Sequence, residues 1–144
     1  MTIAAILKHK GHDVARVNPT TTIAEVVQQL ATRRIGAVIV MDAAHQLLGI
    51  VSERDIVNSL AEHGKRTLEM TAAQLMTREL HTASNSTTVA QATEMMTNGR
   101  FRHLPIVDGD RLVGIVSIGD VVKARLSQQE QEVDSMKAYV AGAA

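Results

Sequence analysis

The sequence contains no cysteine and no tryptophan, and it has one phenylalanine and one tyrosine among 144 residues. Without cysteine the chain has no disulfide, no thiolate nucleophile and no zinc–thiolate site. The scarcity of aromatic rings removes the stacking surface on which proteins bind single-stranded nucleic acid. Fifteen basic residues balance fifteen acidic ones, so a broad phosphate-binding surface is not expected either. We therefore expect no nucleic-acid partner.

Long apolar runs are also missing. The longest lies near AVIVM and is far shorter than the roughly 18 residues that a membrane helix needs. The opening residues, MTIAAILKHK, show neither the basic leader nor the apolar core of a signal peptide. The six histidines form no His-x-x-x-His or Glu-x-x-His pair, so no metal site is expected. These features predict a cytoplasmic protein with no membrane partner.

An internal repeat organises the chain. The segment LGIVSERDIV, residues 48–57, returns as VGIVSIGDVV, residues 113–122. Before it, TTIAEVVQQLATRRIGAVIV aligns with TTVAQATEMMTNGRFRHLPI. The sequence therefore consists of two copies of one unit, residues 4–62 and 72–126, followed by a tail, residues 127–144.

Periodicity predicts the same order of elements in both copies. Short strands at VARV and LHTA precede amphipathic helices at TIAEVVQQLATRR and VAQATEMMTNG. In each copy, two apolar runs that form a hairpin follow this helix, and another helix follows the hairpin. In the second copy the hairpin turns at Asp108-Gly109. The order β-α-β-β-α predicts an α/β (α+β) fold, in which each copy covers the apolar helix faces of the other. We expect two pseudo-symmetric repeats packed as one module, with a long C-terminal helix.

A Ser-x-x-Asp box follows the last apolar strand of each copy, at Ser52 and Asp55 and again at Ser117 and Asp120. This spacing is typical of a helix N-cap, in which the hydroxyl accepts an early backbone N–H and the acid reciprocates. Ligand binding is the alternative. A helix N-terminus suits a phosphate, and a carboxylate one turn in can accept both hydroxyls of a ribose. The residues alone leave both interpretations open.

The sequence resembles the CBS domain, which is named after cystathionine β-synthase. The resemblance rests on the paired GIVSERD and GIVSIGD segments, the run RHLPIVDGDRLVGIVS and the lead-in AAQLMTREL. It implies a pseudo-two-fold pair of repeats with two clefts between the sheets, where family members bind adenosine-containing ligands such as AMP, ATP, S-adenosylmethionine or NAD. It further implies a regulatory module without catalytic residues, with AMP as the first candidate ligand and ATP, ADP or NAD(H) as others. Such a module reports its ligand to an effector protein, which is unknown here.

Position by position, the resemblance also assigns polar contacts. In the family, the serines contact phosphate or ribose and the aspartates hydrogen-bond the two ribose hydroxyls. The matching residues here are Ser52, Asp55, Ser117 and Asp120. Basic residues reach the ligand phosphates, which gives Arg102 and His103. The first copy has Gly36 and Ala37 at these two places, so Arg54 is its candidate phosphate contact. The two sites are therefore expected to differ.

The remaining implied contacts involve glycines and strand backbones. A glycine has no Cβ and lets a ligand approach the strand closely, which assigns Gly49 and Gly114. Backbone groups hydrogen-bond adenine in the family, which assigns Val38, Ile39, Leu104 and Ile106. As apolar strand residues, these four would look the same in a protein whose core has no ligand.

The tail predicts an oligomer. From Val122 onward, a mostly apolar stripe follows a 4-3-4-3-4 spacing through Leu126, Gln129, Val133, Met136 and Val140. We expect a homodimer that the tail and the N-terminal segment TIAAIL help to seal. Two other functions stay open: an assembly module with no ligand, and a nucleotide-processing enzyme, for which the sequence offers no evident base or metal.

Overall fold

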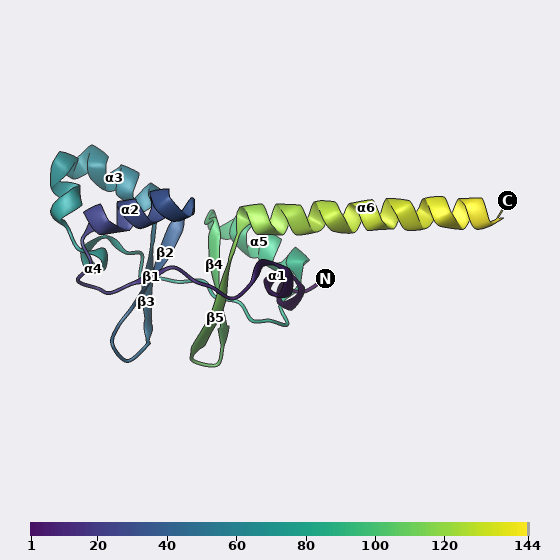
Figure 1. The fold of residues 1–144 in the computed structure, drawn as a ribbon, viewed down its shortest axis with the longest axis horizontal. Helices are drawn as coiled ribbons and strands as arrows, with labels where there is room; N and C mark the ends of the chain where they lie inside the picture. Colours follow the sequence, from purple (N-terminus) through teal and green to yellow (C-terminus); the bar gives the residue numbers. More distant parts are fainter. Residues whose placement is uncertain (144) are drawn as a thin grey trace. The chain divides into compact units, whose positions relative to one another are not determined.

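The computed structural model describes residues 1–143, which form two compact units. One unit consists of residues 1–12, 82–108 and the chain from Val113 onward. We call it the α6 unit after its longest helix. The other, the α3 unit, consists of residues 13–81 and 109–112. Figure 1 shows the elements of both, and each unit has a buried core of its own.

The α3 unit is built on a three-stranded sheet. Its elements are β1 (Arg16–Val17), α2 (Ile23–Arg33), β2 (Ala37–Met41), β3 (Leu47–Ser52), α3 (Glu53–His63), the 3₁₀ helix η1 (Gly64–Glu69) and α4 (Ala72–Leu75). The central strand β2 pairs in parallel with β1 and antiparallel with β3, with Val38 opposite Val51. The apolar stripe of α2 packs against this sheet because Ile23, Val26 and Leu30 recur at helical spacing.

The α6 unit contains a two-stranded sheet and three helices. Its elements are α1 (Ile3–Lys10), α5 (Val89–Gly99), β4 (His103–Asp108), β5 (Arg111–Ser117) and α6 (Ile118–Ala143). The turn between β4 and β5 and the start of β5, residues 109–112, are counted in the α3 unit. The hairpin between β4 and β5 turns at Gly109, whose φ of 62° favours glycine. Leu104 and Ile106 of β4 are wholly buried with Met96 of α5. The predicted α/β class, with two similar repeats and a long C-terminal helix, is confirmed.

One expected strand does not form. The segment LHTA makes a single bridge, in which Ala83 pairs in parallel with Ile106. In the first copy, the N–H of Ile39 donates to the carbonyl oxygen of Ala15 at 3.0 Å. The equivalent of Ile39 in the second copy is Pro105, which has no N–H to donate. The prediction of a strand at LHTA is wrong because the proline removes the bond that would lengthen the bridge.

The helix at the start of each repeat lies in the unit formed by the rest of the other repeat. Helix α1 packs with the second repeat, where Thr2 bridges Thr88. Helix α4 packs with the first repeat, where Thr71 makes the matching bridge to Thr22. The sequence repeats and the compact units therefore divide the chain differently.

The apolar side chains of the segment TIAAIL are buried within the chain itself. Ile3, Ile6 and Leu7 are at most 7% exposed and belong to the core of the α6 unit. The prediction that this segment helps to seal a dimer is wrong for these side chains, because their own unit already covers them.

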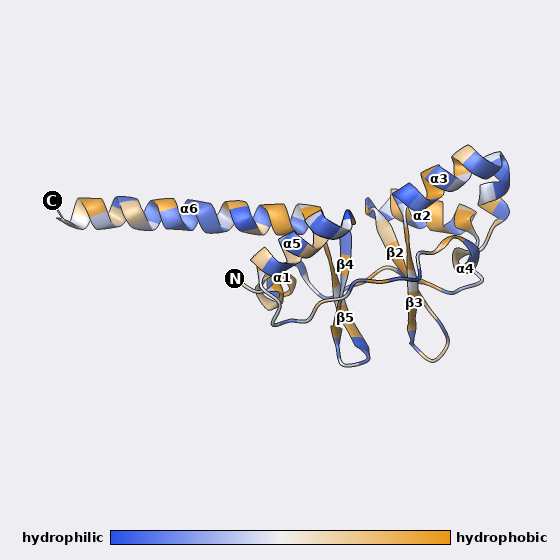
Figure 2. Ribbon diagram, turned by 180° about the vertical axis from the view of Figure 1, so that it is seen from behind, coloured by the Kyte–Doolittle hydropathy of each residue, from blue (hydrophilic) through white to orange (hydrophobic). Residues whose placement is uncertain are grey.

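Helix α6 is the longest element, with 26 residues. Its first turns are anchored by Val121, which is wholly buried, and by Ala124. In Figure 2 polar and apolar residues alternate along the helix beyond that anchor. No helix within residues 1–143 combines the length and the apolar character needed to cross a membrane.

Candidate functional site

The two Ser-x-x-Asp boxes form helix caps at the N-termini of α3 and α6. In the α3 unit, the N–H of Ser52 donates to Asp55 Oδ2 at 2.9 Å, and the N–H of Asp55 donates to Ser52 Oγ at 3.3 Å. In the α6 unit, the bonds of Ser117 and Asp120 are 2.8 and 3.2 Å long. The capping interpretation is therefore confirmed for both boxes. Each cap also fixes a half-buried carboxylate beside the first turn of a helix.

In both units a backbone hydrogen bond joins the residue before the first strand of the hairpin to the residue after the serine of the box. The N–H of Glu53 donates to the carbonyl oxygen of Gly36 at 2.9 Å, and that of Ile118 donates to the carbonyl oxygen of Arg102 at 2.8 Å. Arg102 is therefore directly beside the box of Asp120, in the same unit, and Gly36 takes its place beside Asp55. Arg102 is exposed, and His103 is half-buried at the start of β4.

In the α3 unit, a threonine hydroxyl hydrogen-bonds the carboxylate of Asp55. Thr77 Oγ1, just beyond α4, donates to Asp55 Oδ1 at 3.1 Å, while Oδ2 takes the capping bonds. Arg54 lies one residue before the acid and is exposed. No local signal in the sequence points to Thr77, because it lies 22 positions from Asp55.

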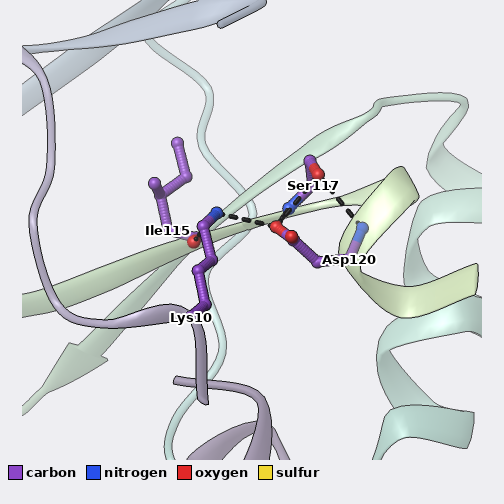
Figure 3. A network of polar contacts seen from close by, with 4 residues as sticks. All are labelled: Lys10, Ile115, Ser117 and Asp120. Carbon is purple, nitrogen blue, oxygen red and sulfur yellow. Dashed lines mark hydrogen bonds and ion pairs between the residues drawn. The ribbon is translucent and has the colours of Figure 1, made fainter. Parts of the chain in front are cut away.

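The α6 unit brings an ammonium group to the equivalent carboxylate. Lys10 Nζ, at the end of α1, lies 2.7 Å from Asp120 Oδ2 and donates to the carbonyl oxygen of Ile115 at 2.8 Å, as Figure 3 shows. Burial raises the pKa of Asp120, but the bonds from Lys10 and Ser117 and the charge of Lys10 together lower it below its ordinary value. The two acids therefore have different partners, a neutral hydroxyl and a cation.

Replacing Lys10 should change the titration of Asp120. In Lys10→Met the pKa of Asp120 should rise, because burial remains while the cation is lost. In the wild type the lowered pKa stabilises the fold above about pH 4, and this contribution disappears as the pH falls through that lowered pKa. NMR titration of the Asp120 carboxyl carbon measures the shift. Lys8→Met, which removes an exposed charge from the same helix, is the control. An unchanged Asp120 pKa in Lys10→Met would contradict the ion pair.

Gly49 and Gly114 are both buried, and the protein itself approaches them closely. A Cβ at Gly49 would lie 2.7 Å from the carbonyl oxygen of Thr77 and 2.8 Å from Met76 Sδ. A Cβ at Gly114 would lie 2.8 Å from Leu7 Cδ2. The structure thus gives both glycines a packing role against the segments that lead into the repeats.

The strand residues assigned to adenine serve the cores. The side chains of Val38, Leu104 and Ile106 are wholly buried in the two hydrophobic clusters. The N–H of Ile39 donates to the carbonyl oxygen of Ala15. A contact between these backbones and adenine stays a prediction. Within residues 1–143, no three His, Asp or Glu side chains come together in a group that could hold a metal ion.

The fold and the duplicated boxes agree with a family comparison. The model of the CBS domain matches residues 8–62 and 72–127. The chain therefore belongs to the CBS domain family.

Its relatives include plant and bacterial proteins. The mitochondrial CBS domain-containing protein CBSX3 of Arabidopsis thaliana is 32% identical over 149 residues, which span 98% of this chain and 72% of that protein. The crystal structure of the CBS-domain containing protein ATU1752 from Agrobacterium tumefaciens is 42% identical, with a TM-score of 0.85. The match covers 87% of this chain and 99% of the Agrobacterium chain.

Two similar structures contain adenosine derivatives. The CBS domain pair of protein MJ0100, in complex with 5′-methylthioadenosine and S-adenosyl-L-methionine, is 25% identical, with a TM-score of 0.79 over 89% of this chain and 98% of that one. Protein PAE2072 from Pyrobaculum aerophilum, complexed with AMP, is 27% identical, with a TM-score of 0.74 over 83% of this chain and 89% of that one.

Proposed function

We propose that this protein is a regulatory module that binds an adenine nucleotide and reports it to an effector protein. The observation that carries the proposal is the duplicated carboxylate, Asp55 and Asp120, which a serine cap holds at a helix N-terminus in each unit. A carboxylate has about four lone-pair positions. The serine cap uses two of them and Thr77 or Lys10 uses a third, so each aspartate keeps one position for a ribose hydroxyl without losing these bonds.

The cations beside the caps support a phosphate-bearing ligand. Lys10 and Arg102 both lie at the box of Asp120, and Arg54 follows Glu53 at the start of α3. Charge-assisted bonds to phosphate are among the stronger polar contacts in proteins. Among the adenosine ligands of the two related structures, this favours AMP, with ADP, ATP or NAD(H) as further candidates.

We propose binding without turnover. Both serine hydroxyls are engaged in the caps, where each accepts an N–H and donates to its own aspartate, at 3.1 Å in the α3 unit and 2.9 Å in the α6 unit. A hydroxyl in this arrangement stabilises a helix terminus. Contact of the two serines with phosphate or ribose stays a prediction. The cytoplasmic location also stays a prediction.

Calorimetric titration tests the proposal. AMP should bind at least about tenfold more tightly than GMP, because an unpaired polar group in a binding site costs about 1–3 kcal/mol. ADP, ATP and NAD(H) should bind in preference to inorganic phosphate. Equal affinities for AMP and GMP would contradict adenine recognition. Absence of binding by every nucleotide would favour the assembly module, and product accumulating over hours would show an enzyme.

A further inference from the structure

The outer part of α6, residues 129–142, is not covered by any other described part of the chain. Every residue from Gln129 to Gly142 is exposed, including Val133 at 51%, Met136 at 64% and Val140 at 63%. Most of the stability of a helix in a protein comes from packing of its apolar face rather than from intrinsic propensity. This segment therefore needs a partner that covers its apolar stripe.

The stripe has the spacing of a coiled-coil seam. In a heptad abcdefg, the a positions are Leu126, Val133 and Val140, and the d positions are Val122, Gln129 and Met136. All of these residues are exposed. Two of the three a residues, Val133 and Val140, are β-branched, as in two-stranded coiled coils, and a single polar residue in the seam fixes the register. Gln129 is that residue here.

The flanking charges distinguish the two possible orientations. Lys123, Glu130 and Lys137 occupy the e positions, and Arg125 and Glu132 occupy g positions. In a parallel pair, a g residue meets the e residue of the next heptad on the other helix. Arg125 would then meet Glu130 of the second copy, and Glu132 would meet Lys137 of the second copy. Both contacts join opposite charges.

An antiparallel pair would join like charges. With all six seam layers overlapped, e positions face e positions and g positions face g positions. Glu130 would face Glu130 of the second copy, Glu132 would face Glu132, and Lys123 would face Lys137. Like charges at these positions destabilise the pair.

We propose that α6 binds a second copy of the chain as a parallel, in-register, two-stranded coiled coil. The seam begins at Val122, after the first turn that carries Asp120, so the pairing does not need a bound nucleotide. The surface is intrinsic to the helix, and its occupant is the same helix of an identical chain.

A single engineered cysteine tests the orientation. The chain has no cysteine, so Met136→Cys provides the only thiol. In a parallel pair the two thiols face each other at a d position, and oxidised glutathione should convert most of the full-length protein into a disulfide-linked dimer. Gln131→Cys, at the outward f position, is the matched control and should cross-link poorly. Equal cross-linking of both variants would overturn the parallel arrangement, as would a Met136→Cys protein that light scattering shows to be dimeric but that forms no disulfide.

A charge reversal tests the flanking contacts without touching a core. Lys137→Glu should weaken the dimer by about tenfold, because two attractive contacts become repulsive ones. Adding Glu132→Lys to the same chain should restore the affinity, because positions 132 and 137 then carry opposite charges again, with the signs exchanged. Sedimentation equilibrium measures the dissociation constants. Tighter association of Lys137→Glu alone would point to the antiparallel pair and overturn the proposal, as would a wild-type protein that is monomeric at tens of micromolar.

Discussion

Asp120→Ala should lose most of the stabilisation that AMP provides through the α6 unit. A ligand at 100 times its dissociation constant stabilises a folded protein by about 2.7 kcal/mol. A variant without the carboxylate cannot bind the ribose and should lose the part of this increment that its own site contributes. Loss of the cap alone would lower the stability of the ligand-free protein by about 0.5–2 kcal/mol and would leave the ligand effect intact. Thermal melts with and without saturating AMP separate the two effects.

The chain offers a control for the cap. Thr88 and Gln91 form the same capping box at α5, with bonds of 2.9 and 3.0 Å. Gln91→Ala should lower the stability of the ligand-free protein, and its AMP-induced shift should equal that of the wild type. If Asp120→Ala behaves in the same way as Gln91→Ala, the Ser-x-x-Asp boxes are caps only.

Asp55→Ala should show a smaller loss with AMP than Asp120→Ala. Lys10 and Arg102 both lie at the box of Asp120, whereas Gly36 takes the place of Arg102 beside Asp55. The site of Asp120 has two cations for the phosphate of AMP, so it should contribute more of the AMP-induced stabilisation. Asp120→Ala should therefore lose more of that stabilisation than Asp55→Ala. Equal losses in the two variants would show that the cations do not distinguish the sites.

Gly49→Ala should be the most destabilising of the conservative substitutions in the strands. Its Cβ would meet the backbone oxygen of Thr77 at 2.7 Å. That backbone cannot move freely, because Ile50 and Thr77 exchange two hydrogen bonds of 2.9 and 3.1 Å. Overpacking of this kind costs about 1–3 kcal/mol, which urea denaturation measures as a lower midpoint.

Gly114→Ala is the matched control at the equivalent position of the second repeat. Its Cβ would meet only the end of the Leu7 side chain, at 2.8 and 3.0 Å. A side chain can rotate away more readily than a backbone, so the loss of stability should be smaller. A larger loss for Gly114→Ala than for Gly49→Ala would contradict this account.

The local features of the fold were predictable from the sequence. The helix expected at VAQATEMMTNG has the bounds of α5, because its cap and its apolar spacing are both local signals. The capping boxes followed from spacing alone. The failed strand at LHTA has its cause in Pro105, on the strand with which it would pair, and the missing N–H is evident only when the two copies are aligned.

Contacts between distant residues were not predictable. Lys10 and Asp120 are 110 positions apart, and neither residue carries a pattern that points to the other. The 3₁₀ helix η1 shows the same limit, because its Thr67 is wholly buried and makes a 2.8 Å hydrogen bond to Ser59. Tertiary packing places side chains such as these, and the two repeats use different residues at equivalent places.

The exchange of leading helices between the units also affects synthesis of the chain on the ribosome. Helix α1 is translated well before its partners Thr87, Leu104 and Val116. Nascent chains generally fold domain by domain from the N-terminus, and apolar surface that waits for its partner is prone to aggregation. Ile3, Ile6 and Leu7 must therefore stay uncovered until most of the chain has been made. By contrast, α4 follows the strands it covers and can dock as soon as it leaves the exit tunnel.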